Sequence, residues 1–594
     1  MLKNISKLFL DGEIGRREFM SRLVCTGVSV SGAAALAAQL TVQNANGGEL
    51  LSEIVPEAGR TIKNATGGEL IAEFLMDWDV PYVFGLAGSE EVGFLDALVD
   101  RTDLQYTISL HENTAMTMAD GYSRSTGKTS VVQLHSVAGT AFALGQIISA
   151  YKDRIPVVIT VGRQSTNFRG RDGFLEAPSL NELPKDYANW TWDVMNGVTI
   201  PEVMRRAFML AEAPPGGPTF ITFSKDLFET RVPETEIIPR SRSLVSKDIA
   251  PSIADVKAIV DHLLASKRPL IFLGNECIHY EISEEVSAIC ELVGAGVLFS
   301  MKIPTIFPNT HPNFIGEIMD DRALLGTIDC FWSLGGNMFK LFNRPSKPLL
   351  KRSTITMHTS LVESEIGRNY PVDVASIASL KTMTTMVLKE LRSRDLSTPA
   401  IKVRQKWVTD YNVKRRAEFK KSAETEWNNM PIATSRLMIE LNKVIDKSAY
   451  IVAELVTSDR FSRRYLDYDH TQDVAERRRN FSTTSGILGW GVGAAVGTKI
   501  GNPDKEVWCL IGDGSFNFGS QGLWSASRYE VPVGFVIFNN GQYQANRINS
   551  ALLKGRMYET GKYIGVDIGH PAIDHVKLAG AYGVEGERVM TRTR

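Results

Sequence analysis

The sequence lacks several features that would point to particular classes of protein. Its five cysteines are scattered and form neither a CxxC pair nor any other spacing typical of a metal site. Lys and Arg number 66 and Asp and Glu number 67, so the overall charge gives no reason to expect nucleic acid or an anionic membrane surface as a partner. Internal repeats and low-complexity segments are also missing. We therefore expect an ordinary globular protein, and its 594 residues are enough for several domains.

The first fifty residues also lack the composition of a folded domain. Arg16 and Arg17 are followed by Phe19 and then by an uncharged stretch, residues 23–48, that is rich in Ala, Gly, Ser and Val. This arrangement resembles a twin-arginine export signal, and we expect residues 1–48 to be a signal and leader for export to the periplasm. An uncleaved anchor is the alternative, but the apolar part is short and rich in Gly and Ser for a spanning helix. Small residues that offer cleavage positions are Ala33, Ala35 and Ala37.

From about residue 66 the sequence alternates between short apolar strands and amphipathic helices, which predicts parallel sheets with helices on both faces. Residues 228–250 are polar and contain prolines, which is typical of a linker, and the highly charged residues 391–429 predict a second connection that is helical. We therefore expect an α/β protein of three consecutive domains, residues 66–227, 251–390 and 431–594. The expected strands are 82–84, 107–110, 129–134, 157–161, 269–273, 330–334, 507–511 and 533–538, and the expected helices are 68–78, 90–99, 114–122, 140–150, 491–498 and 522–529.

Two polar turns follow the last two expected strands. A Gly-Asp-Gly-Ser turn occupies residues 512–515, and a pair of asparagines occupies residues 539–540. Strands of an open parallel sheet end at the edge where ligands bind, so the two turns should lie together. A carboxylate from Asp513 and a neutral oxygen from Asn540 suit Mg²⁺ or Ca²⁺ held jointly with a phosphate, while the glycines let the backbone approach a ligand. Each turn taken alone is also common as a plain turn.

Together the two turns carry a resemblance. The segment GDGSFNFGSQGLWSASRYEVPVGFVIFNNGQY resembles the thiamin-diphosphate signature, which opens with GDG and ends with an Asn pair about 27 residues on. The three expected domains are similar in order to the pyrimidine-binding, central and diphosphate-binding domains of the thiamin-diphosphate decarboxylase and acetolactate synthase superfamily. The residues of the motifs are most similar to those of benzoylformate decarboxylases. The resemblance implies thiamin diphosphate with Mg²⁺ or Ca²⁺ as cofactors, a 2-oxo acid or aldehyde as substrate, and cofactor sites shared between the subunits of a homodimer or homotetramer.

Glu112 is a second candidate site residue, because it opens a helix just after a strand. A carboxylate in this place can be satisfied by the helix N-terminus alone. With the Ala-Asp-Gly-Tyr segment of residues 119–122 behind it, the resemblance implies a different role, in which Glu112 shares a proton with the aminopyrimidine ring of the cofactor. A glutamate in this role should be largely buried and have a raised pKa, because desolvation disfavours its charge.

A glycine-rich turn at residues 485–490 is the third candidate. Taken alone, it is a turn that opens the next helix. In the family this turn bends the cofactor over one apolar side chain, which Leu488 matches, and the carbonyl of Gly486 matches the acceptor for the aminopyrimidine amine. The resemblance thus implies a metal site of Asp513, Asn540 and the carbonyl of Gln542, and a cofactor site that comprises Glu112, Gly486, Leu488, Gly512, Asp513, Gly514, Ser515, Asn540 and Gln542.

Two further segments match benzoylformate decarboxylases, and the resemblance implies that they place Ser89 and His135 in the active site. A histidine at a strand end is otherwise more often a surface or capping residue. The second active-site histidine of those enzymes is replaced here by Phe342, and a neighbouring aromatic pair by Ile548 and Asn549. Loss of an imidazole removes a proton donor and changes the shape of the pocket, which argues against benzoylformate itself as the substrate.

The remaining differences concern the central domain and the end of the chain. Residues 335–342 do not resemble the Arg-Phe-Asp-Asp-Arg type of segment found in flavin-binding relatives, so FAD is not expected. Relatives continue through a helix and a strand after the position of Arg588, whereas six residues remain here, so we expect a shortened diphosphate-binding domain. The expected function is decarboxylation or carboligation of a 2-oxo acid. An acetolactate-synthase-like carboligase and a cofactor-binding protein without catalysis are the alternatives.

Overall fold

The computed structural model describes residues 5, 8, 16–24, 57–300, 306–318, 320–336, 338–339, 345–469 and 477–589. The chain divides into two compact units, one formed by Met1–Arg60 with Ile238–Ser246 and the other by Thr61–Ile237 with Lys247–Arg594. Helix α2 (Arg16–Val24) belongs to the first unit, and the three large sheets belong to the second. Three expected features lie outside the described residues: the cleavage positions at Ala33, Ala35 and Ala37, the side chain of Phe342 and the last five residues of the chain.

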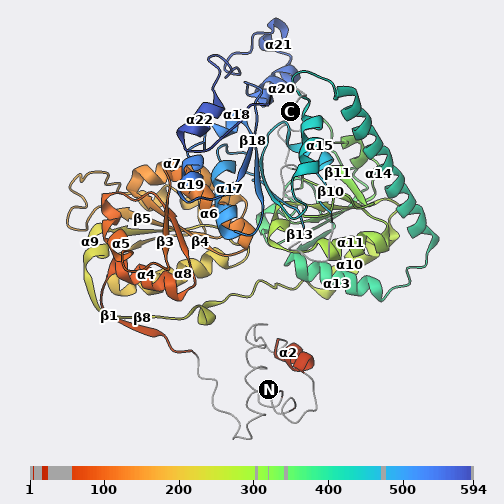
Figure 1. Ribbon diagram of the computed structural model, residues 1–594. Coiled ribbons are helices and arrows are strands. Elements are labelled where there is room, and N and C mark those ends of the chain that lie inside the picture. Colours follow the sequence, from red (N-terminus) through yellow and green to blue (C-terminus); the bar gives the residue numbers. More distant parts are fainter. Residues whose placement is uncertain are drawn as a thin grey trace. The chain divides into compact units, whose positions relative to one another are not determined.

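The first sheet has six parallel strands in the order β3-β2-β4-β5-β7-β6 (Figure 1). Its central strand β5 is buried along its whole length, as expected for an apolar strand of a parallel sheet covered on both faces. The strands are β2 (Tyr82–Gly85), β3 (Gln105–Ile108), β4 (Ser130–His135), β5 (Val157–Arg163), β6 (Trp190–Val194) and β7 (Thr219–Ser224). The helices are α4 (Gly67–Asp77), α5 (Val92–Ala97), α6 (Glu112–Thr126), α7 (Ser136–Lys152), α8 (Ile200–Glu212) and α9 (Lys225–Glu229), and the 3₁₀ turns are η1 (Ser89–Glu91), η2 (Leu180–Glu182), η3 (Lys185–Tyr187) and η4 (Gly197–Thr199).

The second sheet also has six parallel strands, in the order β11-β10-β9-β12-β13-β14. Strands β9, β10 and β12 are buried at every residue, and their apolar side chains form two clusters on opposite faces of the sheet. The strands are β9 (Pro269–Leu273), β10 (Gly296–Phe299), β11 (Phe314–Glu317), β12 (Cys330–Leu334), β13 (Ile355–Ser360) and β14 (Val374–Ile377). The helices are α10 (Ile253–Ala265), α11 (Ser283–Val293), α12 (Arg322–Leu325) and α13 (Leu380–Arg392), with 3₁₀ turns η6 (Asn275–His279) and η7 (Glu363–Glu365), while the 3₁₀ turn η5 (Arg240–Ser243) belongs to the first unit.

The third sheet has four parallel strands, in the order β16-β15-β17-β18. Every residue of β18 is half-buried, because this strand lies at the edge of the sheet. The strands are β15 (Tyr450–Glu454), β16 (Arg479–Phe481), β17 (Val507–Gly512) and β18 (Gly534–Phe538). The helices are α14 (Pro399–Glu426), α15 (Thr434–Val444), α16 (Asp459–Tyr465), α17 (Gly491–Gly501), α18 (Asp513–Phe516), α19 (Gly522–Arg528), α20 (Gln544–Leu553), α21 (Arg556–Thr560) and α22 (His575–Ala581).

Three parallel sheets flanked by helices confirm the α/β fold expected from the sequence, with two local differences. The stretch expected as a linker contains β8 (Arg231–Ile237), which pairs with β1 (Arg60–Thr66) in a small two-stranded sheet and buries Val232 and Ile237. The helix expected over residues 90–99 is instead the 3₁₀ turn η1 followed by the short helix α5. Side-chain contacts of the two glutamates in η1, described below, account for this irregular start.

The first and third sheets of the second unit are connected by packing between α6 and α17. Trp490 Nε1 donates a hydrogen bond to Asp120 Oδ1 at 2.8 Å, and Arg124 pairs with the same aspartate at 3.0 Å. Asp153 accepts hydrogen bonds from the backbone of Thr484 and from Arg124, both at 3.1 Å. Because these groups are buried, each charge needs its partner, and the contacts fix one domain against the other.

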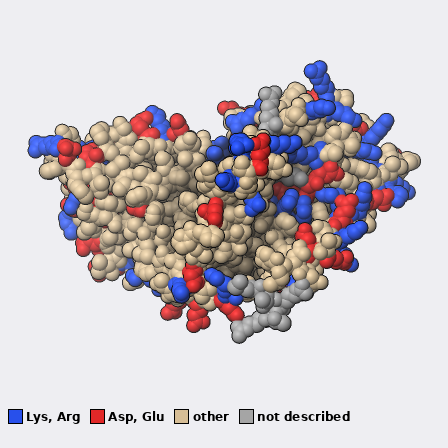
Figure 2. All heavy atoms as spheres, turned by 90° about the horizontal axis from the view of Figure 1, so that it is seen from above, with Lys and Arg blue, Asp and Glu red and all other residues tan. Residues whose placement is uncertain are grey.

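Charged side chains of both signs are interspersed over the face shown in Figure 2, and no large patch of one sign covers it. Among the described helices, none combines the length and the apolar character required to cross a lipid bilayer.

Candidate active site

Ser89, His135 and Glu112 follow three neighbouring strands of the first sheet. Ser89 comes after β2, His135 is the last residue of β4, and Glu112 comes shortly after β3. The sheet order β3-β2-β4 places these strand ends at one edge. The structure therefore brings together the three residues of this domain that the sequence nominated, at the edge where parallel sheets bind ligands.

His135 is held by a carboxylate that the sequence analysis did not identify. Its Nδ1 atom lies 2.9 Å from Glu91 Oε2 and 3.2 Å from Glu90 Oε2. Both neighbours are acceptors, so Nδ1 carries a proton. The hydrogen bond to Glu91 raises the pKa of His135, and the charges of Glu91, Glu90 and Glu112 act in the same direction against the opposing effect of burial.

The approach of His135 to the turn depends on a glycine. A Cβ atom at Gly88 would lie 2.2 Å from His135 Nδ1, so any side chain at this position would displace the imidazole. The backbone N–H of Gly88 donates to Glu91 Oε2 at 2.7 Å, which fixes the same carboxylate from the other side. The sequence shows two acidic residues directly after Ser89, but it does not show their partner. Only the pairing of β2 with β4 reveals that Glu90 and Glu91 contact His135.

Glu112 begins α6 and is 8% exposed, so the expected burial of this residue is confirmed. Its helix is capped by the preceding residue, because His111 Nδ1 accepts a hydrogen bond from the backbone of Asn113 at 3.1 Å. A Cβ atom at Gly139 would lie 3.3 Å from Glu112 Oε1 and 3.6 Å from the Cβ atom of His135. The carboxyl group of Glu112 and the side chain of His135 thus flank the same glycine of α7.

The glycine-rich turn before α17 lies against this domain. Gln146 Nε2 donates to the carbonyl of Leu488 at 3.1 Å, and Asn113 Nδ2 donates to the carbonyl of Gly489 at 3.2 Å. Glu454, the last residue of β15, also fixes the turn. Its two carboxylate oxygens accept hydrogen bonds from the backbone of Gly489 and Gly491 at 2.7 and 2.6 Å. The turn is therefore rigid, and one of its carbonyls is bonded to the residue that follows Glu112.

The predicted metal loop forms a second group at the carboxyl ends of β17 and β18. Asp513 is 4% exposed and its Oδ2 atom accepts a hydrogen bond from the backbone of Gly541 at 2.9 Å. Asn540 Oδ1 accepts from the backbone of Gln542 at 3.0 Å, and Asn540 itself is exposed. The structure thus confirms that the two polar turns lie together, as the sheet topology predicts.

Glycines leave the backbone open at both predicted contact points for a cofactor. A Cβ atom at Gly486, which has a φ of 76°, or at Gly512 would meet no atom within 4 Å. The Gly512 opening lies next to the buried carboxylate of Asp513, and the Gly486 opening lies in the turn that contacts Asn113. A carboxylate, an exposed amide oxygen with a second lone pair and uncovered backbone are the donor set expected for a divalent cation with a diphosphate, so these residues fit such a group.

Three further residues of the last domain concern the predicted site: His575, Ile548 and Asn549. His575 was missed; it packs on Phe516 with ring centroids 5.5 Å apart, and burial lowers its pKa although the charge of Asp513 acts in the opposite direction. Ile548 and Asn549, which stand where the sequence analysis expects an aromatic pair in benzoylformate decarboxylases, lie on α20. Ile548 is 45% exposed, and Asn549 Nδ2 donates to the carbonyl of Ala545 at 2.9 Å.

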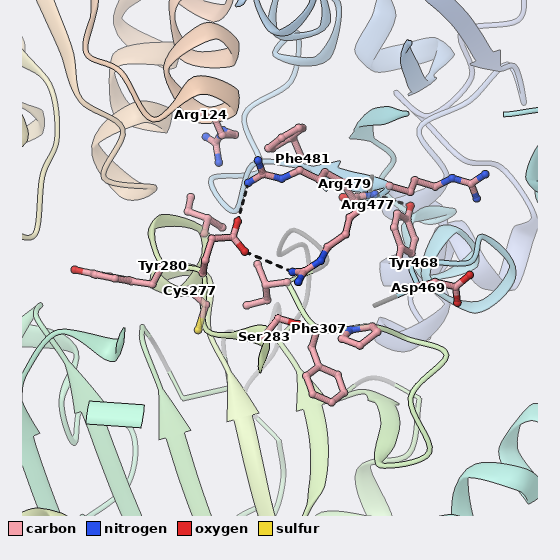
Figure 3. A pocket seen from close by; sticks show the side chains of 16 residues that line it. Arg124, Cys277, Tyr280, Ser283, Phe307, Tyr468, Asp469, Arg477, Arg479 and Phe481 are labelled. Atoms are coloured by element: carbon pink, nitrogen blue, oxygen red, sulfur yellow. Dashed lines mark hydrogen bonds and ion pairs between the residues drawn. The ribbon is translucent and has the colours of Figure 1, made fainter. Parts of the chain in front are cut away.

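A separate cavity of about 60 Å³ lies between the second and third sheets (Figure 3). Cys277, Tyr280 and Phe307 line it from one domain. Arg477 and Arg479 line it from the other and pair with Glu281 at 3.7 and 3.3 Å. None of the residues nominated from the sequence lines this cavity.

Comparison with known families gives three matches in chain order. Residues 65–183 match the description "Thiamine pyrophosphate enzyme, N-terminal TPP binding domain", and residues 256–390 match the central domain of the same family. Residues 464–594 match its C-terminal TPP binding domain. The first and third matches contain the candidate site residues described above.

Curated proteins and solved structures similar to this chain carry two kinds of name. The acetolactate synthase large subunit of Haemophilus influenzae is 24% identical over 87% of this chain and 92% of its own length, and the benzoylformate decarboxylase of Pseudomonas aeruginosa is 25% identical over 86% and 91%. A structure of a thiamine diphosphate-dependent 4-hydroxybenzoylformate decarboxylase from Rhodococcus jostii RHA1 matches with a TM-score of 0.74 and 25% identity over 89% of this chain and 94% of that chain. A benzoylformate decarboxylase structure from Polynucleobacter necessarius matches in fold with a TM-score of 0.75 and 23% identity over the same shares.

Proposed function

Because this chain belongs to the thiamine pyrophosphate enzyme family, as an enzyme of the decarboxylase and acetolactate synthase type, we propose that it acts on a 2-oxo acid by non-oxidative decarboxylation, carboligation or both. One observation carries the proposal. His135, whose Nδ1 faces two carboxylates that raise its pKa, lies across one glycine from the buried carboxyl group of Glu112. The carbonyl oxygen of a 2-oxo acid gains negative charge during the reaction. An acid next to a buried carboxyl group can stabilise that charge by donating a hydrogen bond or a proton.

The residues described above would hold the cofactor at two points. Asp513, Asn540 and the carbonyl of Gln542 would bind Mg²⁺ or Ca²⁺ together with the diphosphate, because carboxylate and carbonyl oxygens are the ligands these cations prefer. The carbonyl of Gly486 would accept a hydrogen bond from the aminopyrimidine, and Leu488 would lie beneath the cofactor. Bound thiamin diphosphate supplies a nucleophilic carbon and an electron sink for the loss of CO₂.

The protein's own groups would hold and move protons at this site. The buried carboxyl group of Glu112 would hold the proton that is shared with the ring nitrogen of the aminopyrimidine. His135 donates from Nε2 to the substrate oxygen, since its Nδ1–H is committed to Glu91. The hydrogen bonds from Asn113 and Gln146 hold the turn at a fixed distance from Glu112.

Thermal unfolding of the purified protein with and without thiamin diphosphate and Mg²⁺ tests the cofactor site first. A ligand that binds only the folded state raises the melting temperature, and a site that holds both must show this shift. CO₂ release from a panel of linear, branched and aromatic 2-oxo acids then tests the reaction. A cofactor-dependent shift without turnover, and without exchange of the cofactor C2 proton, would support the non-catalytic alternative.

Carboligation is the second candidate, and the acetolactate synthases among the similar proteins favour it. Product analysis separates the two reactions. An acyloin or acetohydroxy acid with little free aldehyde indicates ligation, whereas stoichiometric aldehyde and CO₂ indicate simple decarboxylation. Adding a second aldehyde as acceptor sharpens the comparison, because only a ligase incorporates it.

We also propose that the central domain binds no flavin. The carboxylate of Glu276, directly after β9, accepts hydrogen bonds from Ser360 Oγ at 2.6 Å and from the backbone of Leu361 at 2.8 Å. These donors lie at the carboxyl end of β13, where an open parallel sheet binds nucleotides, and the protein's own side chain already engages them. A flavin spectrum in the purified protein would contradict this proposal.

Export by the twin-arginine route is a further proposal, supported by Arg16, Arg17 and the uncharged stretch behind them. That route carries folded proteins, which suits an enzyme that must take up a diphosphate cofactor in the cytoplasm. Fractionation of cells that express the wild-type chain or an Arg16→Lys, Arg17→Lys variant tests it. Equal distribution of the two proteins would count against export.

A further inference from the structure

Glu90 is a buried carboxylate that the reaction scheme above does not use. Its side chain is 4% exposed, and its Oε2 atom lies 2.9 Å from Ser89 Oγ and 3.2 Å from His135 Nδ1. A carboxylate only accepts hydrogen bonds, so the Ser89 hydroxyl is the donor in the first contact. One oxygen atom therefore links the two side chains, Ser89 and His135, that the resemblance places in the active site.

The other groups that face His135 are also acidic. Glu91 Oε2 lies 2.9 Å from His135 Nδ1, the charge of Glu112 acts on the ring from α6, and Tyr106 of β3 lies near Glu91. Within the described parts of the chain, no Lys or Arg forms an ion pair with Glu90 or Glu91. Among the described ion pairs, His135 is thus the basic side chain that faces the two buried carboxylates, and one imidazolium would offset one of their two charges.

We propose that Glu90 is a positioning residue of this active site, whose carboxylate engages the hydroxyl proton of Ser89 and the Nδ1 side of His135. This inference rests on the proposed function. With Nδ1 facing Glu90 and Glu91, His135 presents Nε2–H as the single proton donor of the pair. With its own proton directed at Glu90, Ser89 presents lone pairs to the site and does not donate to the carbonyl oxygen of a 2-oxo acid. Glu90 thereby assigns opposite roles to two residues that would otherwise both act as donors.

The direct test measures the titration of His135 in the folded, cofactor-free protein. The chain contains nine histidines, and the ¹³Cε1–H signal of His135 is identified by its loss in a His135→Gln variant. Glu90→Gln keeps the size of the side chain and a carbonyl acceptor but removes the charge. We expect the midpoint of the His135 titration to fall by about one pH unit, the usual effect of losing one nearby carboxylate. Glu202→Gln, at an exposed position in the first turn of α8, is the matched control and should leave the midpoint in place.

Ser89→Ala provides a second variant, because Ser89 is exposed and its replacement does not threaten the fold. Without the hydroxyl proton, the Glu90 carboxylate interacts with His135 alone, so the midpoint should rise. Opposite shifts in Ser89→Ala and Glu90→Gln support the proposal. An unchanged midpoint in both folded variants would overturn it.

Activity gives a second readout. In Glu90→Gln the alkaline limb of the kcat/KM profile should move to lower pH by the same amount as the titration, so that the variant is up to about tenfold less active above the wild-type midpoint and nearly unchanged well below its own midpoint. A uniform loss at all pH values would indicate a structural role only and would contradict the proposal. If no 2-oxo acid is turned over by folded, cofactor-loaded wild-type protein, the proposed function fails, while the NMR titration still decides the role of Glu90.

Discussion

The side chain of Asn113 donates a hydrogen bond to the carbonyl of Gly489 across 3.2 Å, joining the residue after Glu112 to the turn predicted to cradle the cofactor. In the structure both segments come from one chain. The sequence resemblance instead implies a site shared between two subunits. If two copies of the chain exchanged these segments, the segment with Asn113 of one copy would make the same contact with the Gly489 turn of the other. Which chain supplies each half of the site is therefore a question for experiment.

Mixing two inactive variants answers this question. Glu112→Gln disables the first half of the site and Asp513→Asn disables the second. If a site combines halves from two subunits, a hybrid dimer contains one intact site, and we expect about a quarter of wild-type activity after the variants are unfolded, mixed and refolded together. Sedimentation analysis should show a dimer or tetramer. No recovery from two well-folded variants would indicate that each chain completes its own site.

Glu112→Gln alone should retain the fold and bind the cofactor but lower kcat by roughly 10²-fold or more, the usual contribution of acid and base catalysis. The amide keeps the shape of the side chain and cannot exchange the proton. Steady-state kinetics and exchange of the cofactor C2 proton, followed by NMR, measure the effect. Glu202→Gln, which also removes a carboxylate from the first turn of a helix, is the control and should be fully active. Near-normal turnover of Glu112→Gln would exclude the proton role.

Asp513→Asn should chiefly weaken retention of the metal and the diphosphate, because the carboxylate is the one charged group among the proposed ligands. We expect the rise in melting temperature on addition of thiamin diphosphate and Mg²⁺ to shrink or vanish. Asp504→Asn, an exposed aspartate in the same domain, should keep the full shift. Unchanged cofactor occupancy in folded Asp513→Asn would show that the metal site lies elsewhere.

The predictable parts of the fold are those that depend on local sequence. Buried parallel strands such as β5 and β17 are continuous apolar runs bounded by turns, so their place along the chain follows from composition. Strand β8 could not be recognised, because it has two buried apolar residues among polar ones and forms a strand only by pairing with β1, about 170 residues earlier.

The candidate site divides in the same way. Ser89, Glu112 and Asp513 were found because each lies in a motif read along the chain. Glu90 and Glu91 were not, because their role arises where β2 lies beside β4 and brings His135 onto the turn. Motifs reveal residues that contact a common cofactor, whereas the residues that orient them are specified by tertiary contacts.

His358 predicts how stability depends on acid. This side chain is 1% exposed and its Nε2 lies 2.9 Å from the carbonyl of Gly336, and burial lowers its pKa to about 4. The unfolded chain, in which the pKa returns to about 6.5, binds more protons than the native state between these two values. The free energy of unfolding must therefore fall as the pH falls from about 6.5 to about 4, by roughly 2–3 kcal/mol for this residue.

A His358→Gln variant isolates this effect, because the amide can still donate to Gly336 but does not titrate in this range. Urea unfolding at several pH values from 7.5 to about 4.5 gives the free energy of unfolding of both proteins. The free energy of unfolding should fall more steeply for the wild-type protein than for the variant as the pH is lowered from 7.5. The difference between the two proteins should therefore shift in favour of the variant, whatever its value at pH 7.5. Parallel curves for the two proteins would mean that His358 titrates equally in the native and unfolded states, and that its burial does not hold it neutral.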